Sequence, residues 1–371
     1  HVIALSGTHG KTTTATMVTH CLVALGLSPG YLIGGIPQGL SASAEVGQSG
    51  YFVIEADEYD TAFFDKRSKF IHYHPRTLVI NNLEFDHADI FDDLAAIQRQ
   101  FHHVIRTIAQ QGCVISPETP AIESVLKQGL WCEQQTLALA SDVDLQADIG
   151  SGWQARLLDS AGSEFEVFYD GELCGTVSWQ LIGEHNMMNG LAAIAAVAHA
   201  VSAQLPQSEA SAVSITVQQI IEALSQFAGV KRRLEVIAEH QGITVYDDFA
   251  HHPTAIETTL QGLRSKLGDN AKITAVIEPR SNTMKQGVHQ QQLADCVNLA
   301  SQVFWFEPED LSWSLHQVAR AQSNRAWVIN SVEILVDAVL AQASQGEHIV
   351  VMSNGGFGGF HQQLVEKLRR T

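Results

Sequence analysis

A short glycine-rich loop near the beginning of the chain constrains the fold more than any other feature. The loop follows an apolar run over 1–5 that predicts a buried strand, and it precedes a predicted helix over 11–25. Its residues are Gly7, Thr8, His9, Gly10, Lys11 and Thr12, followed by Thr13. Because a glycine-rich turn between a strand and a helix directs backbone N–H groups toward phosphate oxygens, the sequence predicts an α/β fold with a phosphate-binding loop.

The loop also carries side chains suited to a nucleoside triphosphate. Lys11 is expected to reach the β- and γ-phosphates, and the Thr12 hydroxyl is expected to bind Mg²⁺. The general pattern G-x-x-x-x-G-K-[ST] is not met, because Leu5 stands at its first glycine position and the loop has the shorter form G-T-x-G-K-T. A chance glycine-rich turn is the alternative, which the flanking strand and helix disfavour.

Two further apolar strands are predicted to end in polar clusters. Residues 51–54 lead into the acidic cluster 55–60, and residues 77–80 lead into the polar segment 81–87. Strands of this kind, separated by helical segments, indicate a mostly parallel sheet of the P-loop type. Ligands bind at the carboxyl ends of the strands in such sheets, so the polar clusters are candidate site residues.

The second half of the chain changes character twice. Short alternating segments over 136–181 predict the hairpins of a small added β-sheet. A helix is expected over 186–203, and 206–214 is a Ser/Ala-rich surface segment. Beyond residue 229 strand-like runs alternate again with helical segments, which predicts a smaller Rossmann-like α/β domain. The expected domains are therefore 1–229 and 230–371.

Bulk composition excludes several classes of protein. With 22 basic and 40 acidic residues the net charge is −18, whereas a nucleic-acid binder normally carries a basic face. No apolar run approaches the roughly 20 residues of a membrane span. The five cysteines form no C-x-x-C pair, which predicts reduced thiols rather than a disulfide framework or a zinc site. No signal peptide is recognised, and we expect a cytoplasmic protein. We expect small-molecule substrates, and a monomer or a weak homo-oligomer.

The loop sequence G-T-x-G-K-T-T resembles the Mur ligase family of peptidoglycan synthesis and the related folylpolyglutamate synthetases. Glu55 begins a segment similar to the family's E-A-D-E-x-D, which implies that it ligates Mg²⁺, although a solvated acidic loop is the alternative. His87 ends a segment that resembles N-I-E-x-D-H, which implies a ligand for a second Mg²⁺, although a lone histidine can be purely structural. The resemblance implies ATP with one or two Mg²⁺ ions.

Two further segments carry the resemblance through the rest of the chain. Asn186 and Asn189 lie in a segment similar to G-x-H-N-x-x-N, which implies contact with adenine, whereas helix-capping amides are the alternative. Arg233, Asp248 and His251 lie in segments that resemble the beginning of the family's C-terminal domain. The resemblance implies that Arg233 approaches the nucleotide phosphates and that Asp248 binds ribose with His251 nearby; a solvated linker and a helix start are the alternatives.

One departure from the family pattern concerns the second metal ion. Several members carry a carbamylated lysine soon after the D-H pair, and residues 90–104 contain no lysine. The alanine-adding branch resembles this chain in that respect. The departure restricts the branches of the family that this chain can resemble, and it weakens the case for a second Mg²⁺. It leaves the implied chemistry unchanged, in which a carboxylate is activated as an acyl phosphate and then attacked by an amine.

Segments 52–70, 82–94 and 277–285 look most like the branch that joins UDP-N-acetylmuramate to the tripeptide L-Ala-γ-D-Glu-meso-diaminopimelate during peptidoglycan recycling. The alanine-adding branch resembles them less, because it lacks the insertion over 63–70. A tripeptide with free carboxylates needs cationic anchors, for which Arg280 and Lys285 are candidates, although ordinary surface charge is the alternative.

Alternative functions remain open at this point. Within enzymes they are UDP-N-acetylmuramate–L-alanine ligase and, more weakly, folylpolyglutamate synthetase. In another class, a P-loop nucleotide-dependent switch without ligase activity is the alternative. The family carries a UDP-binding domain before the phosphate loop. Because this loop lies six residues from His1, we expect that domain to be absent from the sequence.

Overall fold

The computed structural model describes residues 1–35, 39–40, 42–140, 152–203, 215–322 and 325–370. The chain divides into two compact units. The N-terminal unit comprises His1–Asp86 and Ile90–Val230, and the C-terminal unit comprises His87–Asp89 and Lys231–Thr371. Each unit has a largely parallel sheet covered by helices, so the predicted α/β fold class is confirmed.

The sheet of the N-terminal unit has ten strands in the order β12-β11-β10-β9-β8-β7-β1-β4-β2-β3. The strand that precedes the glycine-rich loop, β1 (Val2–Ser6), pairs in parallel with β7 (Thr77–Ile80) and with β4 (Phe52–Glu55). The other strands are β2 (Gly30–Leu32), β3 (Ala44–Glu45), β8 (Cys113–Pro117), β9 (Glu133–Leu139), β10 (Gly152–Leu157), β11 (Glu164–Tyr169) and β12 (Glu172–Ser178). The glycine-rich loop therefore follows an interior strand, and the polar ends of β4 and β7 lie on either side of that strand's end.

The small added β-sheet predicted over 136–181 needs a correction. Its strands continue the central sheet, because β9 pairs in parallel with β8 and β10 pairs in parallel with β9. The antiparallel strands β11 and β12 then extend the same sheet. The physical reason is that β8 would otherwise present an edge of unpaired backbone groups, which an adjacent strand satisfies. A separate two-stranded sheet is formed instead by β5 (Asp60–Ala62) and β6 (Asp65–Ser68), which precede the short helix η1 (Lys69–His72).

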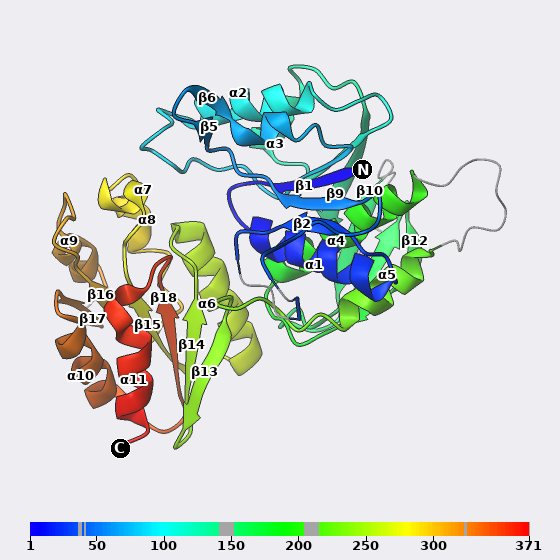
Figure 1. The fold of residues 1–371 in the computed structure, drawn as a ribbon. Coiled ribbons are helices and arrows are strands. Elements are labelled where there is room, and N and C mark those ends of the chain that lie inside the picture. The colour runs from blue at the N-terminus through cyan, green and yellow to red at the C-terminus, as the bar shows by residue number, and fades with distance from the viewer. Residues whose placement is uncertain (36–38, 41, 141–151, 204–214, 323–324, 371) are drawn as a thin grey trace. The chain divides into compact units, whose positions relative to one another are not determined.

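Helices cover both faces of this sheet. Figure 1 shows α1 (Lys11–Ala24), α4 (Glu184–Ser202) and α5 (Val217–Ser225) on one face, and α2 (Leu94–Ile105) and α3 (Pro120–Leu126) on the other. Two apolar clusters fill the layers between helices and strands. Burial on both faces explains why β1 and β7 read as continuous apolar runs rather than as alternating ones.

The C-terminal unit has a six-stranded sheet in the order β13-β14-β18-β15-β16-β17. The strands are β13 (Glu235–His240), β14 (Ile243–Asp248), β15 (Lys272–Ile277), β16 (Gln302–Phe306), β17 (Ala326–Ile329) and β18 (Glu347–Met352). β13 pairs antiparallel with β14, and the pairings from β14 to β17 are parallel. The Rossmann-like arrangement is therefore confirmed, and β13 is a strand that the sequence analysis missed.

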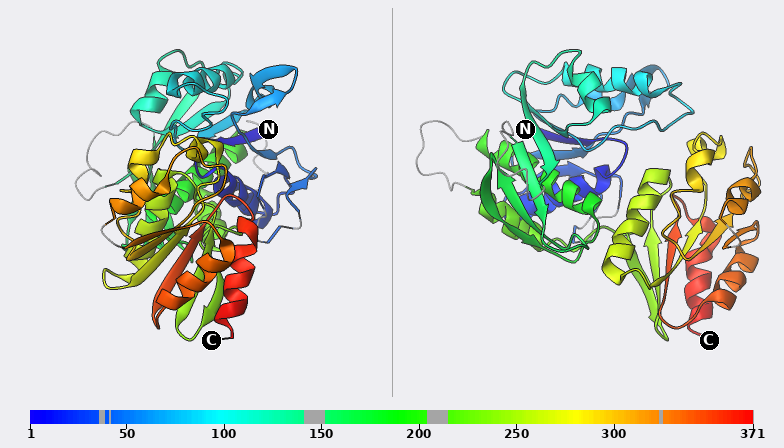
Figure 2. Two further views of the ribbon diagram at one scale, coloured as in Figure 1. Left: turned by 90° about the vertical axis from the view of Figure 1, so that its left-hand side faces the viewer. Right: turned by 180° about the vertical axis from the view of Figure 1, so that it is seen from behind.

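Helices also flank the C-terminal sheet. α6 (Pro253–Leu267) lies on one side of it in Figure 2, whereas α10 (Val332–Gln342) and α11 (Phe360–Leu368) pack together on the other. The short helices are α7 (Asn282–Lys285), α8 (Gln290–Leu293), α9 (Leu315–Arg320) and η3 (Phe357–Gly359). The expected surface segment over 206–214 lies outside the described residues. Within the described ranges, no helix combines the length and the apolar character needed to cross a membrane.

Candidate active site

The glycine-rich loop turns sharply between β1 and α1. Gly7 and Gly10 have φ values of 124° and 81°, a region that side chains disfavour. There is also no room for a side chain, because a Cβ on Gly10 would lie 2.5 Å from the Asn189 Oδ1 and one on Gly7 would lie 2.9 Å from the Asn82 backbone oxygen. Both glycines are thus required by conformation and by space. Thr13 is buried in the first turn of α1.

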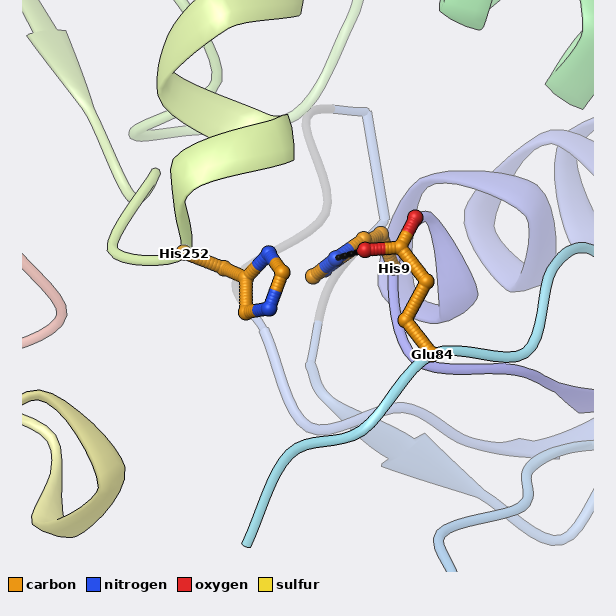
Figure 3. A group of neighbouring side chains, drawn as sticks. All are labelled: His9, Glu84 and His252. Carbon is orange, nitrogen blue, oxygen red and sulfur yellow. Dashed lines mark ion pairs between the residues drawn. The ribbon is translucent and has the colours of Figure 1, made fainter. Parts of the chain in front are cut away.

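The loop is fastened to the segment that follows β7. The His9 backbone N–H donates to the Asn82 Oδ1 at 2.8 Å, and the Asn82 Nδ2 donates back to the His9 carbonyl at 3.2 Å. The Glu84 N–H donates to the Thr8 hydroxyl at 2.8 Å. Figure 3 shows the imidazole of His9 beside the Glu84 carboxylate, with 3.7 Å between the His9 Nε2 and the Glu84 Oε2. These contacts hold the loop in one conformation.

Lys11 lies at the beginning of α1 in an acidic environment. Its Nζ donates to the Gly7 carbonyl at 2.6 Å and lies 3.5 Å from carboxylate oxygens of both Asp57 and Glu58. Burial by itself lowers the pKa of Lys11, but the nearby carboxylates of Glu58, Asp57 and Glu55 outweigh it and raise the pKa above its ordinary value. The ammonium group is therefore held charged at the base of the loop.

Thr12 and Glu55 place two oxygen ligands side by side. The Thr12 hydroxyl donates to the Glu55 Oε1 at 2.7 Å, and the Gly34 N–H donates to the Glu55 Oε2 at 2.7 Å. The strand register explains the pairing, because Glu55 at the end of β4 is the partner of Leu5 in β1. A hydroxyl and a carboxylate are hard oxygen donors of the type that Mg²⁺ prefers, so these residues fit the ion that the resemblance implies.

The two predicted adenine contacts have partners within the protein. The Asn189 Oδ1 accepts from the Thr14 hydroxyl at 3.2 Å and from the Asn81 Nδ2 at 3.3 Å, so it joins α4 to α1 and to the end of β7. The Asn186 Nδ2 donates to the Ile182 carbonyl at 2.8 Å. Both amides therefore contribute to local structure, and Asn189 helps to hold the loop and the first turn of α1 in place.

In the C-terminal unit, Asp248 ends β14 with both carboxyl oxygens bonded to backbone. The Ala250 N–H donates to its Oδ1 at 2.8 Å and the Leu234 N–H donates to its Oδ2 at 2.7 Å. Burial raises the pKa of Asp248, although the charge of Arg233 and these N–H groups oppose the shift. The Arg233 guanidinium lies over the Phe249 ring, 5.1 Å from its centroid. Asp248 thus connects residue 234, close to the start of the main segment of the C-terminal unit, to the turn before α6.

His251 belongs to the same turn. Its Nδ1 lies 3.0 Å from the Phe249 carbonyl, and its ring stands at 88° to the Phe249 ring. The next residue, His252, caps α6 by accepting from the Thr254 N–H at 3.3 Å. The two adjacent histidines therefore differ in role, because one packs on the turn and the other begins the helix.

The two predicted peptide anchors lie near the carboxyl end of β15. Arg280 is half exposed, and its Nη1 lies 3.6 Å from the Oε1 of the buried Glu278. A Cβ on Gly355 would lie 2.3 Å from the Arg280 Nε, so this glycine leaves room for the guanidinium. The Lys285 Nζ donates to the Asp310 Oδ2 at 2.5 Å. Arg280 is thus the more accessible of the two cations.

Residues His87–Asp89 belong to the C-terminal unit, and the Mg²⁺ ligand role implied for His87 stays a prediction. The Ala88 N–H donates to the Thr283 hydroxyl at 3.2 Å, and the Asn282 Nδ2 donates to the Asp89 Oδ2 at 2.9 Å. His87 itself has a φ of 57°, which an L-residue seldom adopts. The D-H motif that looked continuous in sequence is therefore divided between the two units after residue 86.

Some residues of the candidate polar clusters were given no individual role from the sequence. Asp57 and Glu58 were expected only as part of an acidic cluster, yet they are the carboxylates that pair with Lys11. Asn81 and Asn82, which bond to the loop and to its helix, read in the sequence only as a polar strand end. The available signal was their position at a strand end beside the loop strand, but the strand order had to be known to use it.

A phosphate-type loop at the carboxyl end of an interior parallel strand, with a buried lysine and an adjacent hydroxyl–carboxylate pair, defines the class of P-loop-type nucleotide-binding α/β proteins. Within this class, residues 5–197 match the Mur ligase middle domain, and residues 232–355 match the domain described as "Mur ligase, glutamate ligase domain". The chain belongs to the Mur ligase family.

Three relatives illustrate the range of similarity. The UDP-N-acetylmuramate–L-alanyl-γ-D-glutamyl-meso-2,6-diaminoheptandioate ligase of Escherichia coli strain K12 is 50% identical over 370 residues, which cover 100% of this chain and 76% of the relative. A UDP-N-acetylmuramate–L-alanine ligase of Desulfitobacterium hafniense is 29% identical, with 98% of this chain and 76% of the relative covered. The crystal structure of a murein peptide ligase from Psychrobacter arcticus is 42% identical, with a TM-score of 0.72, and covers 100% of this chain and 78% of that one.

Proposed function

We propose that this chain belongs to an ATP-dependent ligase that joins UDP-N-acetylmuramate to the tripeptide L-Ala-γ-D-Glu-meso-diaminopimelate, in peptidoglycan recycling in the cytoplasm. The observation that carries the proposal is the 50% identity, over the full chain, to a relative named for this reaction. The relative named for alanine addition is 29% identical over a similar length, which favours the tripeptide as the amine donor. Arg280, half exposed near the carboxyl end of β15, is our candidate anchor for a peptide carboxylate.

The proposed reaction has two steps. First, the lactyl carboxylate oxygen of UDP-N-acetylmuramate attacks the γ-phosphorus of ATP, the bond to the β-phosphate oxygen breaks, and ADP leaves. The α-amine of the peptide then attacks the carbonyl carbon of the acyl phosphate. The resulting tetrahedral intermediate loses phosphate and the nitrogen loses its proton, which leaves an amide bond. An acyl phosphate reacts readily with water, so the site must exclude solvent during this interval.

Lys11 is the proposed phosphate-binding cation. Because acidic neighbours keep its ammonium group charged, it can neutralise negative charge that develops on the transferred phosphoryl group. The loop between Gly7 and Gly10 would surround the phosphates with backbone N–H groups, since its conformation is held by contacts to residues 81–84. Binding of a phosphate by Lys11 would compete with its present partners Asp57 and Glu58.

The Thr12 hydroxyl and the Glu55 carboxylate are the residues that would hold Mg²⁺. Their oxygen atoms already lie together, 2.7 Å apart, so little rearrangement is needed to ligate one ion. When bound, Mg²⁺ supplies positive charge against the phosphate oxygens. The Gly34 N–H keeps the Glu55 carboxylate oriented toward the beginning of α1.

Product mass spectrometry tests the proposed reaction. The full-length enzyme would be given ATP, UDP-N-acetylmuramate and equal concentrations of L-alanine and the tripeptide. We expect the mass of the UDP-N-acetylmuramoyl-tripeptide to dominate, with one ADP formed per product. A dominant UDP-N-acetylmuramoyl-alanine product would assign the chain to the alanine-adding branch. ATP hydrolysis that no muramyl or amine substrate stimulates would support a nucleotide-dependent switch instead.

A further inference from the structure

A second group of potential metal ligands lies in the N-terminal unit, away from the phosphate loop. It comprises Cys113 at the start of β8, Glu133 at the start of β9 and His199 near the end of α4. One ligand atom from each residue lies within 4.8 Å of the other two. Cys113 and His199 are buried and Glu133 is exposed, so the group opens to solvent on the Glu133 side. The proposed ligase mechanism uses none of these three residues.

The strand register explains why these side chains meet. Thr77 in β7 is the register partner of Cys113, and Cys113 is the register partner of Glu133. The three residues therefore form one row across adjacent parallel strands, and register partners direct their side chains to the same face. α4 covers that face and brings His199 to the row. Cys113 and Glu133 are 20 residues apart and His199 follows 66 residues later, yet strand pairing and α4 bring the three side chains together.

Neighbouring residues orient two of the potential ligands. The Thr77 hydroxyl lies 2.7 Å from the His199 Nδ1 and 2.7 Å from the Nε2 of His1, so it can accept from the first imidazole and donate to the second. That arrangement leaves the Nε2 of His199 as the ligand nitrogen. The Gln135 Nε2 donates to the Glu133 Oε1 at 2.6 Å, which leaves the other carboxylate oxygen for a metal.

This outer set of contacts extends into the core. The indole Nε1 of Trp153 donates to the Gln135 Oε1 at 2.9 Å, so the amide that orients Glu133 is itself held by a buried side chain. Metal ligands in proteins are commonly oriented in this way, with the second imidazole nitrogen and the carboxylate each engaged by a further group.

We propose that Cys113, Glu133 and His199 bind a zinc ion, with a water molecule as the fourth ligand. A thiolate, an imidazole and a carboxylate together select a borderline-soft transition metal over Mg²⁺, which prefers oxygen ligands. Ligands of one tetrahedral zinc lie roughly 3.3–3.8 Å apart at ordinary bond lengths. Binding therefore requires the side chains to move together by about 1 Å, which the exposed Glu133 can supply most easily.

The zinc–sulfur bond would form as the Cys113 thiol loses its proton to solvent. Burial raises the pKa of this thiol, so that the metal-free protein keeps the proton. The ion would join β8 and β9 to the end of α4, and its expected role is structural. Asn189, behind the phosphate loop, lies ten residues before His199 on α4, a distance of about 15 Å along the helix. The proposed site is thus at the opposite end of the parallel strands from the ATP site.

Cobalt titration of the EDTA-treated full-length protein tests the proposal, because a thiolate ligand gives Co²⁺ a charge-transfer absorption band in the near ultraviolet. We expect that band at one equivalent, its displacement by one equivalent of Zn²⁺, and a rise in the thermal unfolding midpoint with Zn²⁺. Cys113→Ser should abolish the band. Cys174→Ser, which alters a half-buried thiol of the same unit, is the matched control and should leave the band unchanged.

Two further variants protect the test against misfolding of Cys113→Ser. Glu133→Gln alters an exposed side chain, and His199→Gln removes the imidazole; each should weaken Zn²⁺ binding by about 10-fold or more. Absence of a charge-transfer band in the wild-type protein would overturn the proposal. So would a band that survives Cys113→Ser, or Zn²⁺ affinity that Glu133→Gln and His199→Gln both leave unchanged.

Discussion

The carboxyl ends of the two parallel sheets carry similar residues in different arrangements. At the phosphate loop, the charged side chains of Lys11, Asp57 and Glu58 face one another around a turn whose backbone N–H groups are kept in place. At the end of β14, Asp248 instead directs both carboxyl oxygens at backbone N–H groups of its own unit. The first arrangement suits charge that a ligand brings, whereas the second suits the support of a turn.

This difference separates residues expected to act in the reaction from residues expected to hold the fold. A charge that pairs with other side chains can exchange partners when a phosphate binds. A carboxylate that accepts two backbone N–H groups cannot exchange them without loosening the chain. The comparison therefore predicts that substitutions at the phosphate loop lower activity and that substitution of Asp248 lowers stability.

The largest expected effect is that of Lys11→Ala. Removal of the phosphate-binding cation should lower the rate of ligation by about 10²–10³-fold, because charge on the transferred group loses its stabilisation. Phosphate release in the presence of both muramyl and peptide substrates measures this rate. Lys127→Ala, at an exposed lysine paired with Glu123, is the matched control and should leave the rate near that of the wild type. A Lys11→Ala enzyme within about tenfold of wild type would contradict the role proposed for the loop.

Glu55→Gln should have a smaller effect on the same assay. The amide keeps the shape of the side chain and can still bond to Thr12, but it carries no charge for Mg²⁺. We expect a 10- to 100-fold increase in the Mg²⁺ concentration needed for half-maximal activity. Glu45→Gln, at an exposed residue of β3, serves as the control. An unchanged Mg²⁺ dependence in Glu55→Gln would remove this carboxylate from the metal site.

Asp248→Asn examines the C-terminal side of the comparison. The new amide can accept one N–H but turns an NH₂ group toward the other, which leaves a buried donor without a partner. The free energy of unfolding should fall by about 1–3 kcal/mol. Urea unfolding measures the change, and Asp269→Asn at an exposed position is its control. A stable Asp248→Asn protein that has lost activity would reverse the comparison, since Asp248 would then act on a ligand rather than on the fold.

The smallest expected effect is on the pH dependence of stability. Acidic neighbours raise the pKa of Lys11 above its ordinary value of 10.5, so the folded state holds this proton more tightly than the unfolded state does. The resulting stabilisation is complete below pH 10.5 and is lost as the pH rises through the folded-state pKa. Lys11→Met should therefore show a smaller loss of stability than wild type as the pH rises above 10.5, measured by urea unfolding.

Asp248 should affect the pH dependence of stability in a different pH range, and its contribution also decreases as the pH rises. Burial raises the pKa of its carboxyl group above the ordinary value of 3.8, so its contribution is present below pH 3.8 and is lost as the pH rises through the folded-state pKa. The Asp248→Asn protein should lack this acid-range component, while it keeps the alkaline component of Lys11. If Lys11→Met and Asp248→Asn changed the stability in the same pH range, the two regions would not contribute to stability independently.

The sequence alone was a good guide to local structure. It predicted the strand before the glycine-rich loop and the helix after it, because a run of buried apolar residues, two glycines and a helix start lie within 25 consecutive positions. It also predicted β7 with its observed bounds, Thr77–Ile80. The antiparallel edge strand β13 was missed, because its Glu-Val-Ile-Ala-Glu-His sequence mixes charged and apolar residues without the continuous run of a buried strand.

What the sequence by itself determined is thus the set of local elements, the phosphate loop and the family to which the motifs belong. Only the tertiary structure decided which side chains meet: the carboxylates of 57 and 58 with Lys11, the Thr12 hydroxyl with Glu55, and the row from Thr77 to Glu133. The physical reason is that backbone propensity acts over a few residues. Strand order and register arise from burying both faces of a whole sheet, and they bring together groups that the chain places far apart.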